Sequence, residues 1–185
     1  MRQVDAVFTR SRKKLPIGGW AIQVWTTIYA FLKTGKWKWK DISHCAVRFH
    51  TRVFSSPHYY QASEGLVNYM SGVQFDKKHE VVRSYTIMLS DEMYKEIRNE
   101  CHDEAGAPYG TMQNIGIFVT DVLSLIGIHM DNPCKKGRNC SELLYKKVIM
   151  KKLGVIDDVN SDKIKPHEVE AIILSHKAQL EVSAE

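Results

Sequence analysis

Of the four cysteines in the chain, Cys140 has the most distinctive local sequence. Asn139-Cys-Ser-Glu142 has the form of a capping box, with Asn139 as the N-cap and Glu142 three positions later. The pattern predicts Cys140 at the first position of a helix, where free N–H groups and the helix dipole favour a thiolate. The same N–H groups can stabilise an oxyanion. We therefore predict that Cys140 is a nucleophile, although a small buried residue at a helix start fits the same segment.

A thiolate enzyme also needs a base, and His44 is the candidate. In the strand predicted over Ile42–Val53, His44 alternates with bulky apolar residues and lies on the opposite face. From that face its ring can point at a neighbouring helix N-terminus. Gln61, on the next predicted strand, Tyr59–Ser63, can orient the imidazole by a hydrogen bond. The competing interpretation is that His44 is an ordinary half-exposed strand histidine.

Other residues that could do chemistry form weaker patterns. No Cys-x-x-Cys or His-Glu-x-x-His spacing occurs, so we expect neither a metal nor a cofactor. Asp157, Asp158 and Asp162 lack the spacing of an EF-hand and are interpreted as a solvated loop. Trp37 and Trp39, set between lysines, can stack on bases or sugars, but half-buried anchors at a helix end are the favoured interpretation.

Periodicity places these residues on an alternation of strands and helices. Besides the two strands already named, strands are predicted at Val4–Thr9, Leu66–Val73 and Glu80–Met88. Helices are predicted over Trp20–Leu32, after Ser90 as N-cap, over Met112–Gly127, over Ser141–Leu153 with Gly154 closing it, and from Pro166 to about Ser175. Consecutive strands with short turns favour an antiparallel sheet.

The most apolar stretch of the chain, Ile115–Ile128, is shorter than the roughly 20 residues that cross a bilayer. It also contains Thr120, Asp121 and Ser124. We therefore predict a buried helix and no transmembrane segment.

Length and composition predict one soluble domain. The chain has 185 residues, of which 44% are apolar and 25% charged, enough for one core and short for two. We assign residues 1–175 to that domain and 176–185 to a polar, frayed tail. The first residues, MRQVDAVFTRSRKK, do not resemble a secretory signal, so we expect a cytoplasmic protein whose cysteines are free thiols.

The formal charge of +5 is concentrated in three basic clusters, Arg10–Lys14, Lys33–Lys40 and Lys146–Lys152. Such clusters attract polyanions, among them nucleic acid, teichoic acids and anionic lipid. Ordinary solvated lysine faces are the favoured interpretation, and polyanion contact stays open.

Six short motifs follow one another along the chain. They are Asp5-Ala-Val-Phe-Thr9, Ser43-His44 in a strand, Tyr60-Gln-Ala-Ser63, Gly106-Ala-Pro-Tyr-Gly110, Asn139-Cys-Ser-Glu142 and Ile164-Lys-Pro166. Their order resembles that of the permuted NlpC/P60 papain-like proteins, which include the YiiX-like group and are distantly related to the lecithin:retinol acyltransferases. In that family His precedes Cys, Cys-Ser-Glu stands on a helix, and Pro begins the last helix. The resemblance extends from about Val4 to Ile173.

The resemblance implies a circularly permuted papain-like α+β fold, in which an antiparallel sheet packs against helices. Carried over by position, it implies Cys140 as the nucleophile, His44 as the base and Gln61 as the polar third member. Tyr109 resembles a position near the active-site cleft, with a role toward substrate or oxyanion. The chain departs from the family pattern at Val4, where a Gly is usual, and at Gln61, where a Glu is common.

The activity implied by the resemblance is that of a cysteine hydrolase, an amidase or peptidase working through a thioester on Cys140. The implied substrates are cell-wall peptides (peptidoglycan) or other amide and thioester compounds. An acyltransferase would use the same Cys-His site with another acceptor. A noncatalytic binding module of the same fold, using its basic surface, is the alternative from a different class. Family members occur in bacteria and phages, so a phage-encoded chain would be virion-associated or in the host cytoplasm.

Overall fold

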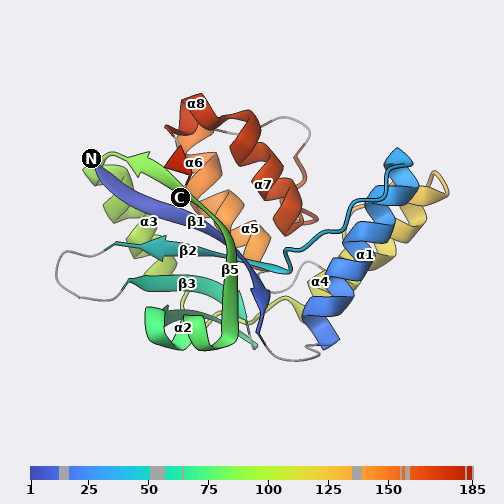
Figure 1. Ribbon diagram of the computed structural model, residues 1–185, viewed down its shortest axis with the longest axis horizontal. Coiled ribbons are helices and arrows are strands. Elements are labelled where there is room, and N and C mark those ends of the chain that lie inside the picture. Colours follow the sequence, from blue (N-terminus) through green and yellow to red (C-terminus); the bar gives the residue numbers. More distant parts are fainter. Residues whose placement is uncertain are drawn as a thin grey trace.

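The computed structural model in Figure 1 describes residues 1–12, 17–50, 57–63, 65–134, 139–154, 156, 159–181 and 183–184. Parts of the predicted features lie outside these residues, including Lys13, Lys14, Val53, Asp157 and Asp158. The described chain forms one antiparallel sheet in the order β4-β3-β2-β1-β5-β6, with helices packed on it. The α+β class and the antiparallel sheet are therefore confirmed.

The strands follow the period-two patterns of the sequence. They are β1 (Arg2–Ser11), β2 (His44–Phe49), β3 (His58–Ser63), β4 (Leu66–Ser71), β5 (His79–Leu89) and the short β6 (Ser183–Ala184). Strand β1 lies at the centre of the sheet, between β2 and β5, and pairs antiparallel with both. His44 is the first residue of β2 and lies opposite Thr9 of β1.

The predicted helices are also present close to their expected positions, and the described residues contain two short helices that were not predicted. They are α1 (Ile17–Thr34), α2 (Gly72–Lys78), α3 (Asp91–Asp103), α4 (Thr111–Leu125), α5 (Cys140–Leu144), α6 (Met150–Leu153), α7 (Pro166–Ser175) and α8 (Lys177–Leu180). A π-helical segment, Tyr145–Ile149, joins α5 to α6. Ser90 caps α3 by accepting a hydrogen bond from the Met93 amide at 3.1 Å, and Gly154 ends α6 with a φ of 82°.

Two segments differ from the sequence prediction. The strand expected over Leu66–Val73 ends at Ser71, whose side chain accepts a hydrogen bond from Gln74 and caps α2. The apolar residues of this segment fit a strand or a helix, and the N-cap at Ser71 favours the helix. The tail expected after Ser175 is not frayed over its described part, because Leu180 of α8 is fully buried and β6 pairs with β5.

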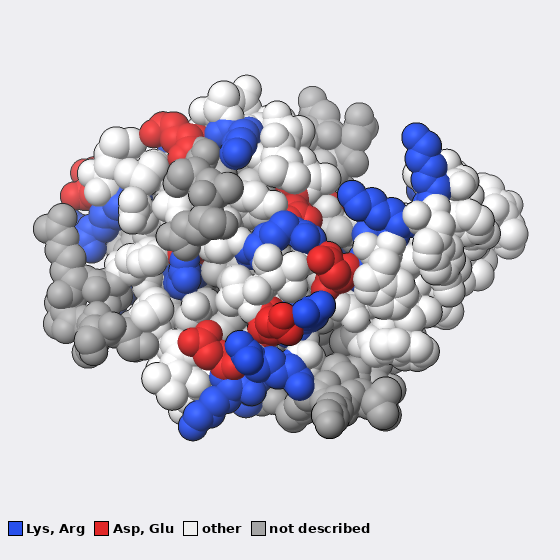
Figure 2. Space-filling view, viewed as in Figure 1, with Lys and Arg blue, Asp and Glu red and all other residues white. Residues whose placement is uncertain are grey.

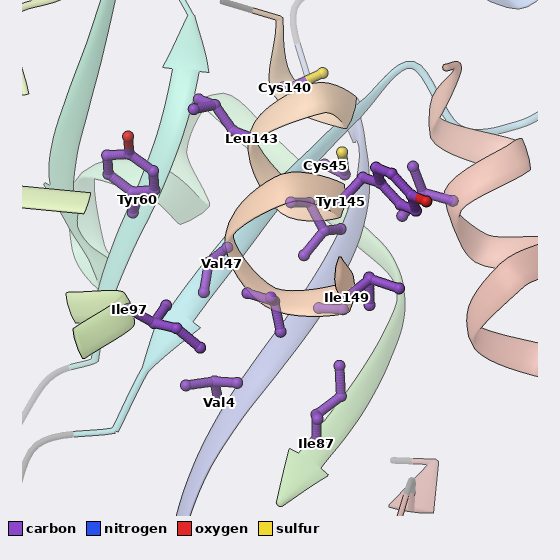
Figure 3. Packing of buried hydrophobic residues seen from close by; sticks show 14 of the residues in the cluster. Val4, Cys45, Val47, Tyr60, Ile87, Ile97, Cys140, Leu143, Tyr145 and Ile149 are labelled. Carbon is purple, nitrogen blue, oxygen red and sulfur yellow. The ribbon is translucent and has the colours of Figure 1, made fainter. Parts of the chain in front are cut away.

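The main hydrophobic core lies between the sheet and the continuous helical segment 140–153, which comprises α5, the π-helical residues and α6 and which we call the helical rod. Figure 3 shows side chains of β1, β2 and β5, such as Val4, Val47 and Ile87, facing that rod. Fully buried Ile149 fills the same layer, and burial of such a side chain stabilises the fold by roughly 1.5–3 kcal/mol. This packing holds the start of α5 against β2, where His44 lies.

Helix α4 contradicts the prediction of a buried helix over Ile115–Ile128. Ile115, Phe118, Val119 and Val122 are exposed, whereas the polar Asp121 is buried. A helix was predicted correctly here, but most of the side chains that face the protein are polar. Within the described residues, no helix combines the length and hydropathy that a bilayer crossing requires.

Candidate functional site

Cys140 is the first residue of α5 and is almost completely buried. Asn139 caps the helix, since its Oδ1 accepts a hydrogen bond from the Glu142 amide at 2.7 Å. The Glu142 carboxylate accepts hydrogen bonds from Gln113 Nε2 at 2.9 Å and from Lys146 Nζ at 2.7 Å. The predicted N-cap is therefore present. Glu142, the other residue of the predicted capping box, also connects α5 to α4 through its hydrogen bond from Gln113.

The structure brings Cys140, His44 and Gln61 together. His44 and Cys140 lie close enough for the charge of each to shift the pKa of the other. On the other side of the ring, His44 Nε2 lies 2.7 Å from Gln61 Oε1 in a buried contact. The three side chains come from β2, β3 and the start of α5, which are distant in sequence.

The sheet register explains why Gln61 reaches His44. Strands β2 and β3 pair Val47 with Tyr60, so these two residues share the face that packs on the helical rod. Alternation then places His44 and Gln61 together on the other face. The Gln61 amide nitrogen contacts Met70 Sδ at 3.6 Å, which leaves its oxygen for the ring.

This arrangement fixes the tautomer and the charge of His44. Because Nε2–H donates to Gln61, Nδ1 is the ring nitrogen available to Cys140. Burial lowers the pKa of His44, but the negative charge and hydrogen bond of Cys140, with the hydrogen bond to Gln61, raise it overall. The site therefore favours an imidazolium beside a thiolate.

The pKa of Cys140 is held well below the usual thiol value. The main cause is a hydrogen bond from Cys45, and the positive charge and hydrogen bond of His44 add to it against the effect of burial. Burial, together with the Cys140 charge, raises the pKa of Cys45 well above the usual value. Cys45 therefore stays a neutral thiol beside the Cys140 thiolate.

Cys45 is a site residue that sequence reasoning missed. The sequence assigned it to the apolar face of a strand, without a role, and it does lie in the core. That same face packs on α5, and Figure 3 shows the sulfur atoms of Cys45 and Cys140 at the start of the helix. The available signal was its position next to His44 on the strand, on the side where a helix had to pack.

His79 is a second missed residue. Its ring stacks on His44 with centroids 4.9 Å apart and an interplanar angle of 19°. Phe75 also packs on His79, and Tyr59 stacks on Phe75 with ring centroids 3.8 Å apart. Burial and the charge of His44 lower the pKa of His79 to about 3, so it is a neutral ring that supports the imidazolium. Sequence gave no signal, because α2, which brings Phe75 and His79 into place, was not predicted.

A small cavity of about 60 Å³ lies beside Cys140. Its lining is mostly apolar and includes Ile22 and Trp25 of α1 and Phe118 of α4. Tyr109 also lines it and accepts a hydrogen bond from Asn114 Nδ2 at 2.8 Å. Burial, with the nearby Cys140 charge, raises the pKa of Tyr109, so its O–H stays available as a donor.

Other candidate residues lie away from this cavity. Among the described residues, no three His, Cys, Asp or Glu side chains are grouped as a metal site would need. Asp162 instead forms an ion pair with Lys146. Trp37 is 62% exposed, so the prediction of a half-buried anchor is wrong for it, and Trp39 is exposed as well.

The basic clusters differ in their surroundings. In the Lys146–Lys152 cluster, lysines pair with glutamates of α3, as Lys147 does with Glu100 and Lys151 with Glu96. These pairs neutralise much of that cluster. Lys36 and Lys38 are exposed and form no ion pair with any described residue.

Comparison of the chain with family models, with curated proteins and with solved structures finds no match, so the site rests on its own geometry.

Proposed function

We propose that the protein is a cysteine hydrolase with Cys140 as nucleophile, His44 as base and Gln61 as the orienting residue. The observation that carries the proposal is that His44, whose Nε2 lies 2.7 Å from Gln61 Oε1, has a raised pKa beside Cys140 and itself lowers the pKa of Cys140. A nucleophile, a base and a group that orients the base are the parts that thiolate catalysis needs. A permuted papain-like fold is part of the proposal, supported by the order His, Gln, Cys along the chain and by the packing of α5 on the sheet.

The reaction begins from the thiolate and imidazolium pair. The Cys140 sulfur attacks the carbonyl carbon, and the electrons of the C=O bond move to oxygen. The tetrahedral intermediate collapses, the acyl bond breaks, and the leaving group takes the proton from His44 Nδ1. His44 then removes a proton from water, which attacks the thioester and releases the carboxylic acid. The thiolate and imidazolium are thereby restored.

Tyr109 is the proposed side-chain donor to the oxyanion. It lines the same cavity as Cys140, and its phenol keeps its proton. The Asn114 amide donates to the phenol oxygen, which leaves the Tyr109 O–H free to point at a substrate. A correctly placed oxyanion donor contributes a factor of about 10²–10³ to kcat.

The cavity lining favours an acyl group that is itself apolar. Ile22, Trp25, Ile117, Phe118 and Ile164 surround the space next to Cys140. Contact with the polar side chains of a cell-wall peptide would contribute little binding free energy here, whereas burial of methylene groups against these residues would contribute more. We therefore propose ester, thioester or amide substrates with an apolar acyl part.

The test is to trap the acyl-enzyme. The protein is incubated with p-nitrophenyl esters of increasing acyl length, and intact mass and peptide mapping follow. We expect an acyl adduct on Cys140 that hydroxylamine removes, together with release of p-nitrophenol. Cys140→Ala should abolish both, and Cys134→Ala, a cysteine outside the site, should change neither. A folded protein that forms no adduct with any ester, amide or thioester would exclude the hydrolase and leave a noncatalytic module.

A further inference from the structure

Helix α4 buries polar side chains and exposes most of its apolar ones, with Ile117 as a buried exception. Gln113 donates to Glu142, and Asp121 accepts a hydrogen bond from Trp25 Nε1 at 2.9 Å. Asp121 also pairs with the buried Lys165 at 3.1 Å. These contacts fix which side of α4 faces the protein, because rotating the helix would leave the buried charges unpaired.

The opposite side of α4 is a continuous apolar stripe. Its exposed residues are Ile115, Phe118, Val119, Val122 and Leu125, spaced three or four positions apart and therefore on one side of the helix, and Ile126, Ile128 and Met130 continue it. Ile126 is 69% exposed. A continuous exposed apolar surface of this kind marks a site of contact with a protein or a membrane.

Helix α1 extends the stripe into a wider surface. It lies beside α4 in Figure 1, where the two helices project from the sheet, and Trp25 packs on Phe118 with ring centroids 4.4 Å apart. Exposed Trp20, Phe31 and Leu32 of α1, with Trp37 and Trp39 just beyond it, complete what we call the α1–α4 face.

The charges of the α1–α4 face are all of one sign. Residues 17–40 contain four lysines and no acidic residue. Residues 106–130 contain one acid, Asp121, which is buried against Lys165. Figure 2 shows basic side chains and no acidic one over the outer part of α1. The face is thus apolar with a basic margin along α1, and exposed Asp131 follows Met130 at the other end.

We propose that the α1–α4 face docks on an anionic lipid bilayer, with α1 and α4 lying in the interface. The exposed stripe of α4 enters the acyl boundary, and Lys33, Lys36 and Lys38 meet the lipid phosphates. Trp37 and Trp39 suit the headgroup level, because their rings are both apolar and polar. A second copy of the chain is a poor occupant, since a symmetric contact would place these lysines against those of the partner.

The protein carries its own reporter of this contact. All four tryptophans of the chain lie in residues 20–39, on or beside the α1–α4 face. Vesicles of phosphatidylcholine with phosphatidylglycerol should therefore shift the tryptophan emission to shorter wavelength and sediment the protein. Pure phosphatidylcholine should bind at least tenfold more weakly, and added salt should release the protein from the anionic vesicles. No binding to anionic vesicles, or dimerisation that removes the exposed face, would overturn the proposal.

Matched variants separate docking from folding and from catalysis. Val119→Asp with Val122→Asp should lower the affinity for anionic vesicles at least tenfold, as should Lys36→Glu with Lys38→Glu. Val73→Asp, an equally apolar exposed change on α2, should leave binding unaltered. Equal loss in Val73→Asp, or none in the α4 double variant, contradicts the assignment. Cys140→Ala should still bind vesicles fully, because docking does not depend on the proposed hydrolase activity.

Discussion

His44 Nε2 and Gln61 Oε1 are 2.7 Å apart, in a buried contact between adjacent strands that leaves Nδ1 of the ring for Cys140. A neutral amide fixes the ring and its tautomer, but it brings no negative charge to stabilise the imidazolium. The thiolate of Cys140 is therefore the main counter-charge of His44.

Replacing Gln61 by Glu should raise the pKa of His44 further, because a carboxylate favours the charged ring. The active pair requires a protonated His44, so the alkaline limb of the pH profile of kcat/KM should move to higher pH. Gln61→Ala should lower kcat and also destabilise the fold by about 1–3 kcal/mol, since it leaves the ring N–H without its buried partner. An unchanged pH profile in Gln61→Glu would remove Gln61 from the proposed triad.

Cys140 should be the fastest of the four cysteines to react with iodoacetamide at about pH 6, where an ordinary thiol is mostly protonated. Its pKa is lowered by Cys45 and His44, whereas burial raises the pKa of Cys45 and of Cys101. Peptide mapping after a short exposure gives the four rates. Faster alkylation of Cys134, the most exposed of the others, would contradict the activated thiolate.

The hydrogen bond from Cys45 should be measurable in the titration of Cys140. Cys45→Ala removes the donor, so the pKa of Cys140 should rise and its alkylation should require higher pH. Cys45→Ser keeps a donor on the same strand and should move the midpoint less. Cys101→Ala, which also shortens a buried cysteine but lies on α3, is the matched control and should not move it. Identical midpoints in all three variants would rule out the Cys45 contact.

His167 should make the protein sensitive to acid. Burial, together with the charges of Lys40 and Lys165, lowers its pKa to about 3, below the usual value of 6.5. The unfolded chain therefore binds this proton first, and stability that is complete above about pH 6.5 is lost as pH falls toward 3, by at most roughly 1.4 kcal/mol per pH unit. Urea unfolding of His167→Asn should show a smaller loss between about pH 6 and 4.

Gly116 should tolerate no larger side chain. A Cβ at this position would collide with the side chain of Asn132, whose amide donates to the Gln113 carbonyl at 3.1 Å and to the Asp162 carbonyl at 3.2 Å. Gly116→Ala should lower the free energy of unfolding by about 1–3 kcal/mol, which chemical denaturation can measure. A matched Gly106→Ala, where the added carbon meets nothing, tests strain of the backbone alone, since its φ is 93°. Equal stability of Gly116→Ala and wild type would show that Asn132 moves freely.

Local sequence determined most of the elements and their ends. Alternation placed β1, β2, β3 and β5, and the caps at Ser90 and Asn139 and the glycine at 154 marked helix ends as the structure has them. The face of His44 could also be predicted, because side-chain direction on a strand depends only on the neighbouring residues.

Only the tertiary structure determined which residues the faces of these strands and helices contact. Periodicity could not reveal that Cys45 lowers the pKa of Cys140 or that His79 stacks on His44, because both pairs join segments far apart in the chain. Apolar composition also misled at α4, which was predicted to be buried but exposes most of its apolar side chains. There the buried Asp121–Lys165 pair turned the polar side inward, a choice set by a partner forty-four positions away and not by any local spacing.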